Sequence, residues 1–416
     1  MTIHDPVRPS FDRLPTPARA DGLLMDVAHR VQLAPTKHAE ADRHYHALCQ
    51  YVDRRGSPLE GKVVSCYPGG SFATGTAIAS SVKNDQHDVD VVMELEIPPT
   101  SNPSQTLSTL FDAINGEPGS RYHGRVKLNS RCVTVTYEDG VRVDLMPIAR
   151  LAAQPEKAGN LFHWQPATGA QFHKPVNPWG FADHFNSHTD YDPVFASLFE
   201  SRGLAGVLVE KADTAPLPDQ VPLSEKSARV VALQLIKRNR DVRFRSREGR
   251  KPPSIVLATL ALESIPTGAG LSSEVIAIAS HMIRRLETES SCGRKLALLN
   301  PAYEPDVFTD RWPYSLTEQN TYIGDLRHLV RQLSRFRDEN ASMTELKTIL
   351  DDLFGETPAG FALDRLLEES RRAIGTKDML FGRTGKVITG AAAAAAASTC
   401  TAARASTNMG GGRLPR

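Results

Sequence analysis

The chain has 416 residues, more than most single domains contain, which predicts two packed lobes with additional terminal segments. Its hydrophobic fraction of 40% and charged fraction of 23% are those of an ordinary globular protein and exclude collagen-like and wholly disordered chains. Because the net charge is only +1, a site for polyanions would have to come from local clusters of basic residues.

The cysteines and the N-terminal sequence indicate where the protein works. The five cysteines are scattered, odd in number and without a C-x-x-C pair, which indicates reduced thiols. The N-terminus carries acidic residues and prolines where a signal peptide would need an unbroken apolar run, and no later segment approaches 18 consecutive apolar residues. We therefore expect a cytoplasmic protein that does not bind a membrane.

The first part of the chain predicts helices around a sheet. Residues 1–20 are rich in proline and are expected to form an irregular arm. Apolar residues recur at helical spacing over 22–54, and Pro35 divides this stretch into two expected helices. Further elements are expected in the order strand 62–67, strand 87–95, helix 104–115, strand 132–137 and strand 141–148. The last two strands flank a Glu-Asp-Gly turn and so predict a hairpin.

The second part predicts mostly helices. Residues 150–223 are rich in Pro, Gly, His and aromatic residues, and we expect an irregular wrap there with helices near 181–186 and 193–202. From Ser224 on, helices are expected at 225–241, 254–264, 272–289, 317–338, 342–354 and 361–374. The segment after Lys386 is of low complexity and cannot bury a core.

Together these elements predict an α/β (α+β) fold of two lobes, with a mixed twisted sheet in one lobe and helices in the other. The expected divisions are an N-terminal arm at 1–20, a sheet-bearing core with an N-terminal helix at 21–223, a helical lobe at 224–385 and a flexible tail at 386–416.

A glycine-serine turn follows the first expected strand, in the stretch GGSFATGTAI at residues 69–78. Such a turn can hold the phosphates of a nucleoside triphosphate through backbone N–H groups and a hydroxyl. A Cβ atom at Gly70 would block the close approach of the phosphates. Gly70 and Ser71 are therefore candidates for binding a nucleotide.

Three acidic residues on two strands form a candidate metal site. Asp88 and Asp90 alternate with valine in HDVDVVMEL, so both side chains must face the same side. Asp144 interrupts the apolar strand VRVDLMPI. Carboxylate oxygens suit a pair of Mg²⁺ ions, with Mn²⁺ as the alternative, and a third carboxylate can also accept the proton of an attacking hydroxyl.

Two simpler interpretations compete with the metal site. A D-x-D pattern on a strand is often a charged device that keeps an edge strand soluble. Asp144 could also be a lone acid that pairs with Arg142 or Arg131.

The ordered Gly70-Ser71, Asp88-Val89-Asp90 and Val143-Asp144-Leu145 resemble the signature of the polymerase-β-like nucleotidyltransferases. With the stretches WQP, NPWGFADHF and VVALQLIKRNRD, the chain more closely resembles the bacterial cGAS/DncV-like nucleotidyltransferases, from about residue 40 to about residue 375. The resemblance implies a nucleotidyltransferase core followed by an OAS-like helical lobe.

The resemblance also implies roles for the site residues. Gly70 and Ser71 would hold the donor triphosphate, and Asp88 and Asp90 would bind both metal ions. Asp144 would bind the catalytic metal and activate the 2′- or 3′-hydroxyl of the acceptor nucleotide, with pyrophosphate as the leaving group.

Two residues of the helical lobe also match positions that contact donor phosphates in this family, Lys237 and Ser254. For Lys237 the alternative is a snorkelling side chain at a helix end. Ten basic residues lie between Lys226 and Lys251. We interpret them as a solvated loop with one or two phosphate contacts.

The activity that the resemblance implies is the joining of nucleoside triphosphates (ATP, GTP or others) into a cyclic di- or trinucleotide. This second messenger would serve anti-phage (CBASS) defence by acting on a downstream effector, and nucleic acid would not be required. The alternative is a linear nucleotidyltransferase of the poly(A), CCA-adding or antibiotic-modifying type. Many relatives end in a flexible peptide that an accessory protein captures, so the terminal GGGRLPR is either such a handle or a plain disordered terminus.

Overall fold

The structure, a computed structural model, describes residues 17–80, 87–193, 195, 222, 225–337, 341–375, 379–381 and 387–389. The chain divides into two compact units, one formed by Thr16–Ala362 and the other by Met1–Pro15 with Leu363–Arg416. All residues of the candidate site lie in the larger unit. Within the described ranges every helix is too short or too polar to cross a lipid bilayer.

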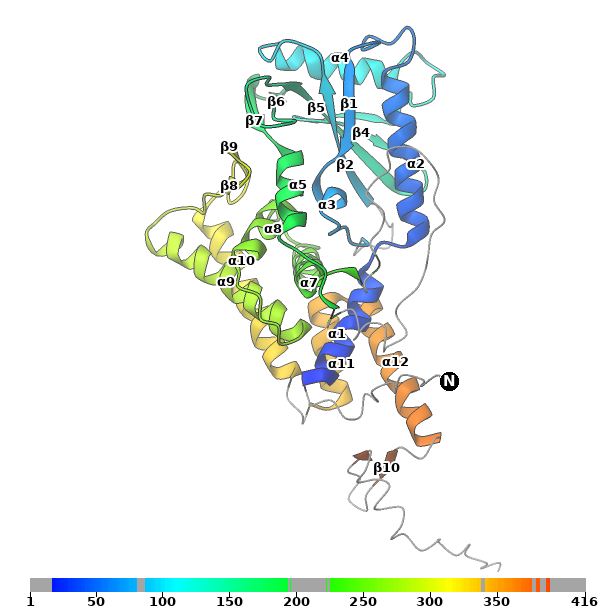
Figure 1. The fold of residues 1–416 in the computed structure, drawn as a ribbon, viewed down its shortest axis with the longest axis vertical. Coiled ribbons are helices and arrows are strands. Elements are labelled where there is room, and N and C mark those ends of the chain that lie inside the picture. Colours follow the sequence, from blue (N-terminus) through cyan, green and yellow to red (C-terminus); the bar gives the residue numbers. More distant parts are fainter. Residues whose placement is uncertain are drawn as a thin grey trace, which may run out of the picture. The chain divides into compact units, whose positions relative to one another are not determined.

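The larger unit contains a seven-stranded mixed sheet (Figure 1). Five strands follow the order β1-β2-β5-β4-β3, while β6 pairs with β5 and β7 pairs with β6. Their bounds are β1 Val63–Pro68, β2 His87–Leu95, β3 Val126–Leu128, β4 Val133–Thr136, β5 Val141–Arg150, β6 Gly159–Gln165 and β7 Ala170–Val176. The strands β2 and β5 are parallel, whereas the other pairs are antiparallel.

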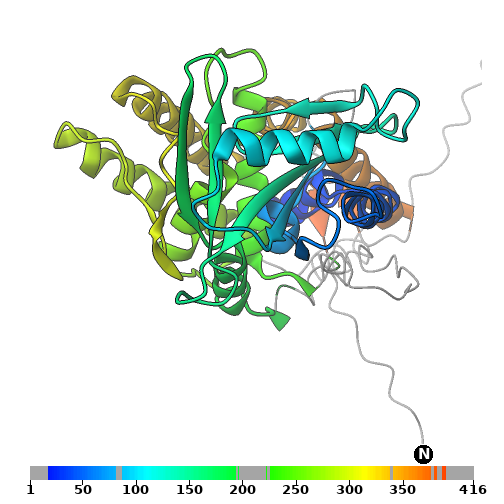
Figure 2. The same cartoon turned by 90° about the horizontal axis from the view of Figure 1, so that it is seen from above.

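Two helices cover one face of this sheet, α2 (Pro35–Val52) and α4 (Pro103–Asn115) (Figure 1, Figure 2). Their apolar residues form one core with the inward side chains of β2, β4 and β5. Val89 and Val143 belong to this core and are fully buried. Because side chains alternate along a strand, the residues next to these valines must face the opposite side of the sheet.

Most of the other elements of the larger unit are helices. They are α1 Pro17–Val31, α3 Gly70–Ala73, α5 Pro178–Ser187, α7 Ala228–Arg243, α8 Ser254–Glu263, α9 Leu271–Ser291, α10 Leu316–Phe336 and α11 Met343–Phe354. The helix α7 is buried along most of its length and packs against α1, α8, α9 and α11. Ser227 caps it by accepting a hydrogen bond from the backbone N–H of Val230.

The remaining elements are α12 (Glu356–Gly375), the hairpin of β10 (Met379–Phe381) and β11 (Val387–Thr389), and a short pair of β8 (Leu299–Asn300) and β9 (Tyr303–Val307). The mixed sheet and the helices confirm the expected α/β fold. Pro35 begins the second helix, as its position in the sequence predicted.

The expectation of an irregular wrap over 150–223 was wrong for its first part. The strands β6 and β7 form a hairpin there and extend the sheet from β5. Polar and aromatic residues such as Gln165 and His173 hide the strand alternation in the sequence, and the pairing with β5 depends on contacts far along the chain. The helix expected near 193–202 falls almost entirely outside the described residues.

Candidate active site

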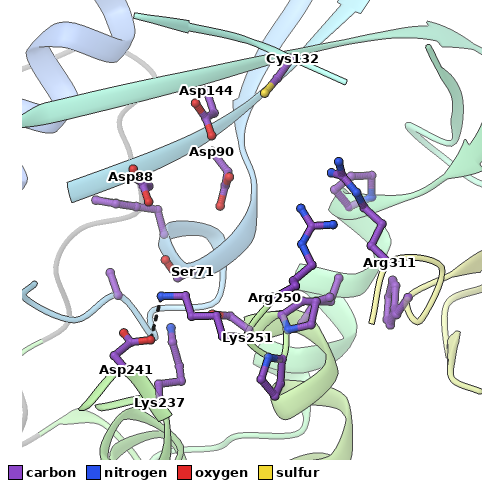
Figure 3. Close-up of a pocket in the computed structure, with 18 of the residues that line it drawn as sticks. Ser71, Asp88, Asp90, Cys132, Asp144, Lys237, Asp241, Arg250, Lys251 and Arg311 are labelled. Atoms are coloured by element: carbon purple, nitrogen blue, oxygen red, sulfur yellow. Dashed lines mark hydrogen bonds and ion pairs between the residues drawn. The ribbon is translucent and has the colours of Figure 1, made fainter. Parts of the chain in front are cut away.

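A cavity of about 880 Å³ lies in the larger unit, against the face of the sheet opposite α2 and α4. Its lining includes Asp88, Asp90 and Asp144, the three acids that the sequence singled out. The other predicted side chains, Ser71, Lys237 and Ser254, line the same cavity. Figure 3 shows the first two of them. The structure thus brings together residues that are far apart in the sequence.

The register of two parallel strands fixes the position of the acids. Asp90 on β2 lies beside Asp144 on β5. Asp88 is two residues before Asp90 on β2, so both side chains point to the same face of the sheet. Their chain neighbours Val89 and Val143 point into the core on the other face. If the pairing register of either strand shifted by one residue, an acid would point into the hydrophobic core and a valine would point into the cavity.

The glycine-serine turn packs directly against the second acid. The backbone N–H of Gly69 donates a 2.8 Å hydrogen bond to the carbonyl oxygen of Asp90. Gly70 has a φ of +53°, and a Cβ atom placed on it would lie 2.9 Å from the carboxylate carbon of Asp90. Glycine is therefore needed here both for the backbone conformation and for space. Ser71 follows in α3 and lines the cavity.

The acids destabilise each other's charges. Burial raises the pKa of Asp90 to about 7, with further contributions from Asp144 and Asp88 and a smaller opposing effect of Lys237. Burial also raises the pKa of Asp144, and the hydrogen bond from the Thr134 hydroxyl partly offsets this rise. Negative charge is thus concentrated at one end of the cavity.

Both simpler interpretations of the acids are wrong in this structure. The strand β2 lies inside the sheet between β1 and β5, so the D-x-D pattern does not decorate an edge strand. Arg142 approaches Asp88, with its Nε atom 3.5 Å from Oδ1, and Arg131 pairs with Asp310. Among the described residues, neither arginine forms an ion pair with Asp144.

The chemistry of the acids fits magnesium. All three donors are carboxylates, and hard divalent cations such as Mg²⁺ prefer oxygen ligands. The described residues contain no group of three or more His, Cys, Asp or Glu side chains already gathered around a single point. The carboxylates instead share one cavity wall. Burial is the main cause of the raised pKa of Asp90, and a cation between the carboxylates would offset the repulsion that adds to it.

Lys237 lies deep in the protein rather than at its surface. Its side chain is only 3% exposed, so the snorkelling interpretation is wrong. Nζ donates hydrogen bonds of 2.6 Å to the backbone oxygen of Thr76 and 3.2 Å to its Oγ1 atom. Burial, with a further contribution from Arg240, lowers the pKa of the lysine to about 7.

Ser254 is the first residue of α8 and lines the same cavity as Lys237. Its Oγ atom accepts a 3.2 Å hydrogen bond from Nη1 of Arg240. The same guanidinium nitrogen also donates to the carbonyl oxygen of Pro252, at 2.8 Å. Arg240 thereby holds the residues at the N-terminus of α8 in place.

The interpretation of the basic cluster as a solvated loop was wrong for half of its members. The five basic residues from 226 to 240 are buried, namely Lys226, Arg229, Lys237, Arg238 and Arg240. Most of their polar contacts reach distant parts of the chain. Arg229, for example, pairs with Glu274, and Arg238 donates to the carbonyl oxygen of Phe354.

Sequence reasoning missed one wall of the cavity. Lys174 on β7 and Arg311 in the loop after β9 both line it. Figure 3 shows Arg250 and Arg311 projecting from the side opposite the acids. No local motif marks these residues, because long-range pairing of the strands and loops brings them together.

The chain is similar to nucleotide-signal synthases. A family model described as "Second Messenger Oligonucleotide or Dinucleotide Synthetase domain" matches residues 22–175. The cyclic dinucleotide synthase CdnG of Bradyrhizobium diazoefficiens is 32% identical over 401 residues, which cover 94% of each chain. A c-di-GMP synthase of Roseivirga ehrenbergii is 20% identical over 80% of this chain and 84% of its own length.

Solved structures agree with this similarity. The structure of the Bradyrhizobium diazoefficiens CD-NTase CdnG in complex with GTP superposes with a TM-score of 0.70 at 31% identity, over 84% of this chain and 99% of that chain. The E. coli MS115-1 CdnC:HORMA-deltaN complex matches with a TM-score of 0.54 at 16% identity, over 81% of this chain and 96% of that chain. The second match concerns the fold alone.

Proposed function

The chain belongs to the bacterial cGAS/DncV-like nucleotidyltransferases, and on that premise we propose that it joins two nucleoside triphosphates into a cyclic dinucleotide with the help of magnesium. The observation that carries the proposal is the convergence of Asp88, Asp90 and Asp144 on one cavity beside Ser71. The names of the relatives support the product class, and the GTP complex of CdnG supports GTP as one substrate.

The glycine-serine turn and the helical side of the cavity hold the donor nucleotide. The backbone at Gly70 and the hydroxyl of Ser71 bind the triphosphate, since no side chain at Gly70 obstructs it. Lys237 and Ser254 face the same space and contact the phosphates from the other side. A cavity of about 880 Å³ is at the upper end of small-molecule sites, which suits two nucleotides.

Asp144 accepts the proton of the acceptor hydroxyl. Burial makes its carboxylate more basic than usual, as a general base requires. The hydroxyl oxygen forms a bond to the α-phosphorus of the donor, the bond to the bridging oxygen breaks, and pyrophosphate leaves. Asp88, Asp90 and Asp144 would hold magnesium, which when bound neutralises charge on the triphosphate and the departing pyrophosphate. A second transfer within the linear intermediate closes the ring.

The double variant Asp88→Ala/Asp90→Ala tests this proposal. We expect it to fold, since it removes mutually repelling carboxylates, and to lose metal-dependent pyrophosphate release from labelled ATP, GTP, CTP and UTP. The matched control Asp112→Ala/Glu117→Ala removes two exposed carboxylates outside the cavity lining and should retain activity. Activity that survives in the first variant would contradict the mechanism.

Phosphatase treatment of the product separates a ring from a linear chain, because a ring has no terminal phosphate. A resistant product supports the cyclic dinucleotide, and its mass distinguishes a dinucleotide from a trinucleotide. A product that loses its phosphates identifies a linear nucleotidyltransferase of the poly(A), CCA-adding or antibiotic-modifying type. Replacing Mg²⁺ by Mn²⁺ or adding a chelator in the same assay tests the metal requirement.

The biological role we propose is cytoplasmic anti-phage defence, in which the cyclic product activates an effector. Phage plating on cells that carry the gene with its neighbours should depend on Asp88 and Asp90. We further propose that an accessory protein binds the segment after Lys386. Deleting that segment while retaining both activity and partner binding would contradict this second proposal.

A further inference from the structure

Thr134 on β4 lies directly opposite Asp144 in the antiparallel pairing of β4 with β5. It is 2% exposed, and its Oγ1 atom is hydrogen-bonded to Oδ1 of Asp144. Behind it, Nδ2 of Asn129 lies 2.6 Å from the same Oγ1 atom. Three polar side chains thus form a short hydrogen-bonded series that ends at the third acid of the cavity.

The chemistry of the three groups determines which one donates and which one accepts in each of the two hydrogen bonds. An ionised carboxylate has no proton to give, so the Thr134 hydroxyl must donate to Asp144. The hydroxyl oxygen must then accept from Asn129, and only the NH₂ group of an amide can donate. Each residue holds the next one in a single orientation.

The turn that carries Asn129 is itself held in place. Its backbone N–H donates to the carbonyl oxygen of Cys132, at 2.9 Å. Ser130 accepts from two distant parts of the unit, at its carbonyl from the N–H of Trp164 and at its hydroxyl from Arg311, each at 2.9 Å. The turn is therefore braced by β6 and by the loop that forms the opposite wall of the cavity.

We infer that Thr134 and Asn129 are positioning residues. The Thr134 hydroxyl, held by Asn129, occupies Oδ1 of Asp144 and leaves Oδ2 to face the reacting groups. Among the described residues Oδ2 of Asp144 makes no hydrogen bond, whereas Oδ1 is taken by Thr134. The inference rests on the proposed function, because it assigns the free oxygen to the acceptor hydroxyl and to the metal. If the Asp144 carboxylate rotated freely, either of its oxygens, or neither, would point at the acceptor hydroxyl and the metal at a given moment.

Four variants of the full chain test the inference. Thr134→Val keeps the shape of the side chain and removes the hydroxyl, whereas Thr134→Ser restores the hydroxyl. Asn129→Asp replaces the donor by an acceptor and so draws the Thr134 hydroxyl away from Asp144. Thr136→Val removes a hydroxyl at the exposed end of the same strand and serves as the matched control.

Two readouts are needed, steady-state kinetics of pyrophosphate release and binding of Mn²⁺ without nucleotide, followed by its electron paramagnetic resonance signal. We expect Thr134→Val and Asn129→Asp to lower kcat by about 10- to 100-fold and to weaken Mn²⁺ binding about tenfold, with little change in KM for the donor. Thr134→Ser and Thr136→Val should resemble the wild type.

The outcomes separate this inference from the proposed function. Wild-type kcat and Mn²⁺ affinity in Thr134→Val would overturn the inference alone. A wild-type chain without any nucleotidyl transfer would overturn the proposed function, and Mn²⁺ binding would then decide the positioning role. If Thr134→Val fails to fold, as circular dichroism would show, Asn129→Asp decides, since Asn129 is only partly buried.

Discussion

Gly70 and Asp90 are so close that a methyl group on the glycine would stand 2.9 Å from the carboxylate carbon of the acid. The glycine-serine turn and the strand β2 are therefore packed directly against each other at this point. A substitution of Gly70 should therefore lower activity by displacing the Asp90 carboxylate.

We expect Gly70→Ala to lower kcat by about 100-fold, because it displaces the Asp90 carboxylate in addition to straining the backbone. Gly75→Ala is the matched control, since Gly75 also has a positive φ of +62° but a Cβ atom there would meet no described atom within 4 Å. Both variants should lose about 1 kcal/mol of unfolding free energy from the left-handed conformation. Equal kcat values in the two variants would show that the closeness to Asp90 is unimportant.

The buried charge of Asp90 predicts a stability that depends on pH and on metal. The pKa of the folded state, about 7, lies above the ordinary value of 3.8, so the folded state binds the proton more tightly. The contribution of Asp90 to stability is therefore greatest at low pH and is lost as the pH rises from about 4 to 7. Asp90→Asn should stabilise the metal-free chain at pH 8 by about 1–2 kcal/mol and have little effect at pH 4.

Thermal unfolding with and without MgCl₂ checks this prediction. Magnesium should stabilise the wild type at pH 8 more than it stabilises Asp90→Asn, because only the wild type presents the full set of carboxylates. The exposed Asp112 provides a control, and Asp112→Asn should leave the effect of magnesium unchanged. A destabilised Asp90→Asn chain at pH 8 would show that the acid is satisfied without a cation.

Two buried lysines near α7 allow a matched test of donor binding. Lys237 lines the large cavity, whereas Lys226 lines an adjoining cavity of about 250 Å³, outside the lining of the large one, and donates to Oε1 of Gln32. We expect Lys237→Met to raise KM for the donor nucleotide about tenfold through the loss of a phosphate contact, and Lys226→Met to leave KM unchanged. A similar KM in both variants would assign Lys237 to structure alone.

We expect replacement of Arg238 to lower the free energy of unfolding without changing nucleotide binding. Its Nε atom donates a 2.9 Å hydrogen bond to the carbonyl oxygen of Phe354, the last residue of α11, and Nη1 donates to the carbonyl oxygen of Ala79 at 3.3 Å. Arg238→Met would leave buried carbonyl groups unpaired, which costs about 1–3 kcal/mol. Urea unfolding should show this loss, while KM for both nucleotides stays as in the wild type. A changed KM would mean that α11 shapes the cavity.

The sequence predicted the acid-bearing wall well, for a physical reason. Asp88 and Asp90 alternate with valines that fill the core, and this period of two determines which side chains share a face. The turn at Gly70 was predictable because few residues other than glycine tolerate its backbone conformation.

The opposite wall could not be predicted in the same way. Arg131 pairs with Asp310, 179 positions further along the chain, and nothing near either residue indicates the other. The hairpin of β6 and β7 was missed because its register depends on β5 rather than on its own composition. Burial of Lys237 and its neighbours likewise depends on how α7 packs among the other helices.

The two walls of the cavity differ in how freely they can change during evolution. The acids lie on strands whose alternate side chains are part of the hydrophobic core, so the backbone that positions the acids cannot shift without disturbing the core. Arg250 and Arg311 lie on loops, and neither residue belongs to the hydrophobic core of the sheet. Under the proposed function, we therefore expect base preference to change through substitutions on the loop side, while the carboxylates of β2 and β5 keep their positions.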